Sequence, residues 1–168
     1  MPLGEDFYMK SLTKYVQSRD DDFIIGSSRR LTGVKRFEAA ALRRLRIHIV
    51  NEHEKINYVE FPAKNIQATK EFFTEVFGWS FQDFGPDYTA FSNQGLDGGF
   101  YRAELHSSTS NGAGLIVFYS TDLEASQDKI EKANGVIVKP IFSFPGGRRF
   151  HFTEPSGNEF AVWSDNNA

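Results

Sequence analysis

The sequence contains no cysteine, which excludes a disulfide framework and a thiolate metal site. It also has no apolar run of about eighteen residues, the length that a transmembrane helix needs. The N-terminus carries Glu5 and Asp6 and lacks the apolar segment of a secretory signal. From these absences we expect a soluble, cytoplasmic protein with no membrane partner.

The chain has 168 residues, of which 15% are aromatic, including seventeen phenylalanines. This supports one domain with a well-filled core and an appendage. Residues 1–53 hold ten Lys/Arg and seven Asp/Glu, a net charge of +3, whereas residues 54–168 hold nine and fifteen, a net charge of −6, and the two sum to −3. The larger, acidic part is not typical of a nucleic-acid binder.

Residues 1–53 form a basic N-terminal extension, which we predict to be partly helical or poorly ordered. Its Arg and Lys residues favour either a solvated extension or a basic helix that touches RNA, an acidic partner or a membrane surface. A translation start at Val50 is a further hypothesis, because a polar lead into the first strand follows it. Residues 54–168 form the predicted domain proper.

The stretch from Ile56 to Trp79 occurs twice. When the sequence is shifted by 57 positions without a gap, residues 59–78 align with residues 116–135. Similar residue types recur along this register: Phe61 and Phe118, Asn65 and Asp122, Ile66 and Leu123, Ala68 and Ala125, Thr69 and Ser126, Gly78 and Gly135. The pattern indicates an internal duplication.

Each copy predicts a strand, a turn and a helix. Asn65 and Asp122 are good N-caps, because their side-chain oxygens accept a free N–H of the first turn. Gly78 is predicted to end the first helix in the left-handed conformation, and Gly135 is predicted to stop the second helix. Apolar residues at helical spacing give each helix one buried face.

Three further strands are predicted after each helix, at residues 80–84, 88–92 and 98–102, and at 136–143, 148–153 and 158–163. The repeats, 56–103 and 113–165, are joined by a polar linker at 104–112. The predicted fold is therefore α+β, with paired β-α-β-β-β repeats forming a cupped mixed sheet and the helices outside.

Two motifs in these repeats carry a family resemblance. The first, Asn65 to Gly78, reads N-I-x-A-T-x-x-F-F-x-x-V-F-G, and the second, Glu154 to Phe160, reads E-P-S-G-N-x-F. They are similar to D-L-x-x-S-x-x-F-Y-x-x-x-L-G and D-P-x-G-N-x-I/F of the vicinal oxygen chelate superfamily, which includes glyoxalase I, bleomycin-resistance proteins, fosfomycin-resistance enzymes and extradiol dioxygenases. The resemblance covers about residues 55–165 and implies the fold; the same fold hosts many functions.

The resemblance also implies one divalent metal, held in the cup by His, Glu or Gln from four strands. These ligand positions fall on Tyr58, Leu115, Ala161 and a residue within 98–100. Leu and Ala have no donor atom, and Tyr, with a pKa near 10, is seldom a ligand to Zn, Ni or Mn. We therefore expect no metal cofactor. A displaced set of Glu60, His151 and Glu159 is the alternative for a divalent metal.

The predicted inner face of the cup is aromatic with a few charges. Strand alternation assigns to it Tyr58, Glu60, Phe100, Arg102, Val117, Tyr119, Glu159 and Trp163. Such a lining suits a small organic ligand, although the same aromatics could pack against a partner subunit. Arg148 and His151 complete the predicted ligand-binding set, with Arg148 and Arg149 either binding an anionic group or anchoring a loop.

Three functional hypotheses follow. In the first, the protein binds a small organic ligand without the usual metal, as the bleomycin-resistance branch does. In the second, it is a lyase, isomerase or dioxygenase-like enzyme, with the displaced metal set or with Glu60 as a general base whose pKa burial raises. In the third, the basic extension mediates an interaction. The resemblance further implies a homodimer.

Overall fold

The computed structural model describes residues 53–166, so all but the last residue of the predicted N-terminal extension lies outside it. The elements in chain order are β1 (Tyr58–Ala63), α3 (Ile66–Phe77), β2 (Phe81–Asp83), β3 (Tyr88–Phe91), β4 (Asp97–Arg102), a 3-10 turn η1 (Thr109–Asn111), β5 (Ile116–Tyr119), α4 (Leu123–Lys132), β6 (Val136–Phe144), β7 (Gly147–Thr153) and β8 (Glu159–Ser164). In this part of the chain, no helix is long and apolar enough to span a membrane.

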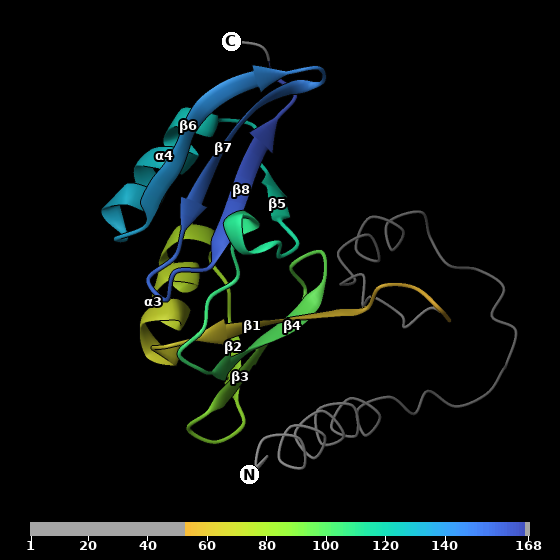
Figure 1. The fold of residues 1–168 in the computed structure, drawn as a ribbon, viewed down its shortest axis with the longest axis vertical. Coiled ribbons are helices and arrows are strands. Elements are labelled where there is room, and N and C mark those ends of the chain that lie inside the picture. Colours follow the sequence, from red (N-terminus) through yellow and green to blue (C-terminus); the bar gives the residue numbers. More distant parts are fainter. Residues whose placement is uncertain (1–52, 167–168) are drawn as a thin grey trace, which may run out of the picture. The chain divides into compact units, whose positions relative to one another are not determined.

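Each repeat forms its own four-stranded sheet (Figure 1). The first sheet has the order β1-β4-β3-β2 and the second has β5-β8-β7-β6. In both, the first strand of the repeat pairs in parallel with the last, and the other pairs are antiparallel. The predicted α+β fold with two β-α-β-β-β repeats is therefore confirmed.

Helix α3 begins and ends where the sequence predicts. The Asn65 side chain accepts a hydrogen bond from the backbone N–H of Ala68 at 3.1 Å, and Gly78 closes the helix with a φ of 70°. A left-handed residue at this position costs least when it is glycine. The face that α3 buries carries Phe72 and Phe73, which are 2% and 0% exposed.

Helix α4 differs from its prediction at the C-terminus. Asp122 caps its start, with the Ala125 N–H donating to Asp122 Oδ1 at 2.9 Å. The helix ends at Lys132, and the left-handed residue is Asn134, with a φ of 66°, rather than Gly135. Gly135 is instead required by crowding, because a Cβ there would lie 2.5 Å from a side-chain carbon of Ile130.

The two repeats share one aromatic core. Phe77 of α3 stacks on Phe118 of β5 with ring centroids 4.6 Å apart, and Phe61 of β1 meets Phe160 of β8 edge-on at 5.1 Å. Aromatic pairs of this geometry add about 0.5–1.5 kcal/mol each beyond the area they bury. The halves are therefore held together by packing as well as by chain connectivity.

Asn158, in the second motif, ties three segments together by hydrogen bonds. Its Nδ2 donates to the Pro62 carbonyl at 2.7 Å, and its Oδ1 accepts from the Ser107 N–H at 2.8 Å. Asn158 is fully buried, so both ends of its amide are satisfied by the protein. The second motif thus joins the first strand and the linker to the second repeat.

Candidate functional site

The first sheet presents a polar cluster on the face opposite to the core. Side chains alternate along β1, so Tyr58 and Glu60 lie on one face and Phe61 lies in the core. Tyr88 of β3 reaches the same face. Its hydroxyl donates to Glu60 Oε1 at 2.8 Å and lies 2.7 Å from the Tyr58 hydroxyl.

Gly99 of β4 makes room for this cluster. It pairs with Glu60 in the sheet, and a Cβ at Gly99 would lie 2.2 Å from the Tyr88 hydroxyl oxygen. The Tyr88 ring therefore occupies the space that any other residue at this position would fill. A glycine within a strand commonly marks such a close approach.

Burial sets the protonation of this cluster. It raises the pKa of the Glu60 carboxyl, while the hydrogen bond from Tyr88 acts in the opposite direction. Burial also raises the pKa of Tyr88 far above the ordinary value, with contributions from Tyr58 and Glu60. Tyr88 therefore keeps its proton and donates it in hydrogen bonds. Glu60 has the raised pKa that a general base needs.

Two residues predicted for the inner face lie elsewhere. Phe100 pairs with Phe61, is fully buried and packs in the core, so it lies on the face opposite to Glu60. Arg102 shares that face and forms an ion pair with Asp87 at 2.7 Å. The prediction was wrong for both residues because β4 pairs with β1 in a register that places Gly99, rather than Phe100, beside Glu60.

The second sheet presents an aromatic open face. Tyr119 of β5 pairs with Trp163 of β8, and their rings meet edge-on with centroids 5.3 Å apart. Val117 and Tyr119 are 41% and 54% exposed. The Tyr119 hydroxyl donates to Asp165 Oδ1 at 2.8 Å, which raises the pKa of Tyr119. These positions agree with the predicted inner face.

His151 and Glu159 form a buried pair on the same face. His151 Nδ1 lies 2.8 Å from Glu159 Oε1, and the residues are 6% and 9% exposed. Thr109 of η1 donates to Glu159 Oε2 through its N–H at 2.7 Å and through its hydroxyl at 2.8 Å. The linker between the repeats therefore helps to build this pair.

A cleft of about 470 Å³ lies over the pair. Its lining includes His106 and Thr109 from the linker, Lys139 from β6, and the pair itself. No residue of the first sheet is among the lining residues, so within residues 53–166 the cleft is separate from the tyrosine cluster. The described part of the chain thus offers two polar centres, one on each sheet.

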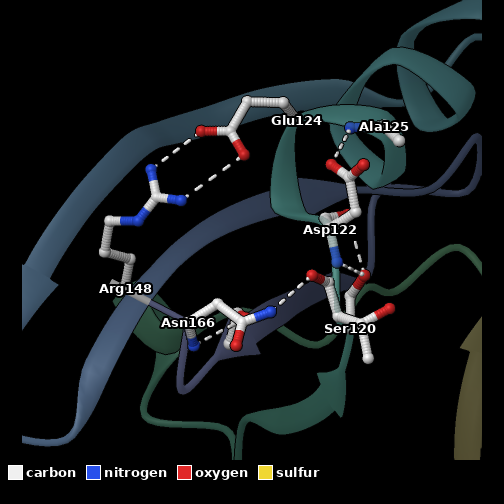
Figure 2. Close-up of polar contacts among 8 residues, drawn as sticks. Ser120, Asp122, Glu124, Ala125, Arg148 and Asn166 are labelled. Carbon is white, nitrogen blue, oxygen red and sulfur yellow. Dashed lines mark hydrogen bonds and ion pairs between the residues drawn. The ribbon is translucent and has the colours of Figure 1, made fainter. Parts of the chain in front are cut away.

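Arg148 does not point toward this cleft. It lies on the helix-facing side of β7, where its guanidinium pairs with the carboxylate of Glu124 in α4, at 2.8 Å for the Nη1–Oε1 contact and 3.5 Å for Nη2–Oε2 (Figure 2). The ion pair lowers the pKa of Glu124. Arg148 therefore links β7 to α4 rather than lining the inner face. Arg149, its neighbour, has its guanidinium carbon 5.1 Å from the Phe142 ring centroid.

The residues at the family's metal-ligand positions do not fit a divalent ion. Leu115 and Ala161 have no donor atom, and the Tyr58 hydroxyl is hydrogen-bonded to Tyr88. Across residues 53–166, no three His, Cys, Asp or Glu side chains gather as a metal site. The structure brings His151 and Glu159 together but does not group Glu60 with them.

Four contributors to these centres were not predicted from the sequence: Tyr88, His106, Thr109 and Lys139. Thr109 and His106 were assigned to a plain linker, and no local pattern shows that the linker docks on β8. A signal for Tyr88 existed in Gly98-Gly99, since paired glycines inside a strand indicate that something approaches closely.

The sequence profile of the Glyoxalase/Bleomycin resistance protein/Dioxygenase superfamily matches residues 55–162, well over half of the chain. The chain belongs to this superfamily. The family resemblance predicted from the two motifs is thereby confirmed.

The individual proteins that this chain resembles are distant from it in sequence. Anthracycline biosynthesis protein DauV from a Streptomyces species is 30% identical over an alignment of 124 residues. The match covers 63% of this chain and 45% of the relative, so the chain spans less than half of that protein. A glyoxalase-related enzyme from Fulvimarina pelagi has a TM-score of 0.57 at 13% identity, covering 67% of this chain and 88% of that one. The fosfomycin resistance protein FosX from Listeria monocytogenes has a TM-score of 0.56 at 14% identity, covering 67% and 94%. These structural likenesses show the fold.

Proposed function

We propose that this protein binds a small, planar organic molecule on the open face of its second sheet, without the metal of the superfamily's enzymes. The observation that carries the proposal is the Tyr119–Trp163 pair, in which Tyr119 is exposed and Trp163 is half-buried. The pair lies on the same strand face as Glu159 and the cleft. Aromatic side chains with a few convergent polar groups are typical of small-molecule sites. The donor-free positions Leu115 and Ala161 support the metal-free part of the proposal.

Two relatives are named for small organic molecules. One is named for anthracycline biosynthesis, and anthracyclines contain a planar anthraquinone ring system. Another is named for resistance to fosfomycin, a small molecule. Because the chain covers less than half of the first relative, these names guide the choice of probes only.

Tryptophan fluorescence gives a direct test. The chain has two tryptophans, of which Trp79 lies in the core at 7% exposure and Trp163 lies on the open face. Titration with 2-hydroxyanthraquinone is expected to quench Trp163 saturably. The Trp163→Phe variant should lose most of the quenching, whereas Trp79→Phe should keep it. Quenching that never saturates, or that survives in Trp163→Phe, would contradict the proposal.

A metal panel completes this test. Chelator-treated protein is heated with Zn, Ni, Mn, Fe or Co, since a ligand of the native state at a hundredfold excess over Kd adds about 2.7 kcal/mol of stability. We expect no saturable rise in Tm. A rise with one metal would contradict the metal-free part, and its loss in Glu60→Gln or Glu159→Gln would locate the site.

The tyrosine cluster favours a second candidate function, a lyase or isomerase with Glu60 as general base. Its support is the raised pKa of Glu60 beside the hydroxyl donors Tyr88 and Tyr58. Turnover of a 2-oxo or epoxide substrate that Glu60→Gln abolishes, with Kd unchanged, would establish it. Binding without turnover leaves the first function.

We also infer a homodimer in the cytoplasm. Large apolar side chains stay exposed in the described part of the chain, and such surface often marks an interface: Ile56 at 82%, Leu105 at 63%, Val136 at 59% and Val138 at 49%. Sedimentation velocity at micromolar concentration should give a dimer, and a monomer would contradict the inference.

A further inference from the structure

One ring nitrogen of His151 is buried without a partner. His151 is 6% exposed, and its Nδ1 contacts Glu159 Oε1 at 2.8 Å. Its Nε2 has no hydrogen-bond partner among residues 53–166. His151 is among the residues that line the cleft. Buried polar atoms are nearly always satisfied, so the unpartnered Nε2 lacks a hydrogen-bond partner that a ligand could supply.

The neighbours of His151 fix its tautomer. Glu159 accepts hydrogen bonds from the Thr109 N–H and hydroxyl as well as contacting His151. Burial acts to raise the pKa of Glu159, but the hydrogen bonds from His151 and Thr109 outweigh it, and the pKa is lowered. An ionised carboxylate only accepts, so Nδ1 must be the protonated nitrogen. In neutral His151 the lone pair then lies on Nε2.

The lining of the cleft includes a cation, Lys139, that can stabilise an anion formed when Nε2 takes a proton. Lys139 of β6 pairs directly with His151 in the sheet, and its Nζ lies 4.2 Å from the ring centroid of Phe142. Phe142 in turn packs 6.0 Å from the His151 ring. The other titratable lining residues are His106 and Glu159, and Glu159 is engaged by Thr109 and His151.

We propose that the His151–Glu159 pair is a proton acceptor for an organic ligand with an acidic hydroxyl, such as a phenol or an enol. The ligand O–H bond breaks, and its proton moves to Nε2. His151 becomes an imidazolium, the ligand becomes an oxyanion, and Glu159 stays a carboxylate that holds Nδ1–H. Lys139 and the imidazolium then face the oxyanion. The inference rests on the proposed function and names the ligand class within it.

The His151–Glu159 pair has the arrangement that a general base needs. A histidine whose second nitrogen is held by a carboxylate is fixed in orientation and in tautomer, and the carboxylate stabilises the cation that forms. The sheet supplies this rigidity here, since His151 and Glu159 lie on the paired strands β7 and β8.

A matched pair of probes tests the proposal, namely 2-hydroxyanthraquinone and its methyl ether, 2-methoxyanthraquinone. The hydroxyl compound should bind at least about tenfold more tightly than the ether, as expected for a hydrogen bond to a charged group. Its bound form should show the red-shifted absorption of the oxyanion at a pH where the free compound is neutral.

His151→Gln should lower the affinity for the hydroxyl compound about tenfold, abolish the oxyanion absorption and leave the affinity for the ether unchanged. His53→Gln is the control, because His53 is 92% exposed and lies outside the cleft. Nitrogen-15 NMR of the histidine rings checks the tautomer without a ligand, and the resonance lost in His151→Gln should be that of an Nδ1–H tautomer.

Three results would overturn the proposal. If both compounds bind with equal affinity, and if His151→Gln changes neither affinity, His151 is not the proton acceptor, but the proposed function still holds. An Nε2–H tautomer for His151 would do the same. Failure of both compounds to bind would remove the proposed function as well.

Discussion

Thr69 and Glu154, which lie 85 positions apart, are joined by a hydrogen bond of 2.7 Å from the Thr69 hydroxyl to Glu154 Oε2. Both residues are buried, at 0% and 2% exposure, and they belong to the two motifs that mark the family. Burial raises the pKa of Glu154, against the hydrogen bonds from Ser156, Thr69 and Asn158. The motif residues thus stabilise the contact between the repeats rather than contact a ligand.

Removing this hydroxyl should destabilise the fold. Thr69→Val keeps the volume but leaves Glu154 with one donor fewer, so we expect a loss of about 1–3 kcal/mol in the free energy of unfolding. Urea denaturation measures it. Ser126→Ala is the matched control, since Ser126 holds the equivalent place in the second repeat and bonds only within its own turn. Equal losses in the two variants would count against a special role for Thr69.

Glu159 should make the free energy of unfolding depend on pH in the acid range. Its pKa is lowered on folding, so the unfolded chain binds more protons as the pH falls through the ordinary Glu value of 4.5. The stability that Glu159 contributes is therefore full above that value and lost as the pH falls through the folded pKa. Wild type should exceed Glu159→Gln in unfolding free energy at pH 7, and the gap should shrink as the pH falls below 4.5. A gap that does not change with pH would refute this reasoning.

Gly99→Ala should disrupt the tyrosine cluster. The new Cβ would lie 2.2 Å from the Tyr88 hydroxyl and 3.0 Å from the Thr89 carbonyl oxygen, so the ring must leave Glu60. We expect a loss of about 1–3 kcal/mol, typical of overpacking. Gly114→Ala is the control, because nothing lies within 4 Å of its added Cβ. If both variants melt like the wild type, Gly99 is not crowded in solution.

Arg148→Met should have a small effect. The partner Glu124 has a side chain that is 59% exposed, and solvent-screened ion pairs of this kind contribute little to stability. Because Arg148 faces α4, the affinity for 2-hydroxyanthraquinone should not change. Calorimetry measures the unfolding free energy and the affinity on the same samples. A tenfold loss of affinity would show that Arg148 belongs to the binding site.

The repeat, the N-caps of both helices and the family were predictable from the sequence because each depends on residues close in the chain. Asn65 caps α3 by accepting a hydrogen bond from Ala68, three residues along the chain, and the 57-residue repeat is found by comparing short aligned stretches. The position of Phe100 was not predictable in this way. Its side depends on which residue of β4 pairs with β1, and a slip of one residue moves a side chain to the other face.

The candidate site divides along the same line. The sequence alone indicated several of the residues that form the site, namely the aromatic strand residues, His151 and Glu159. Residue type and strand alternation are local properties, so no tertiary structure was needed for this. Folding added the contacts that give them chemistry: Thr109 reaches Glu159 from 50 positions away, and Tyr88 reaches Glu60 from 28. Hydrogen bonds require atoms about 3 Å apart, and between distant segments only the pairing of strands and the docking of the linker determine that distance.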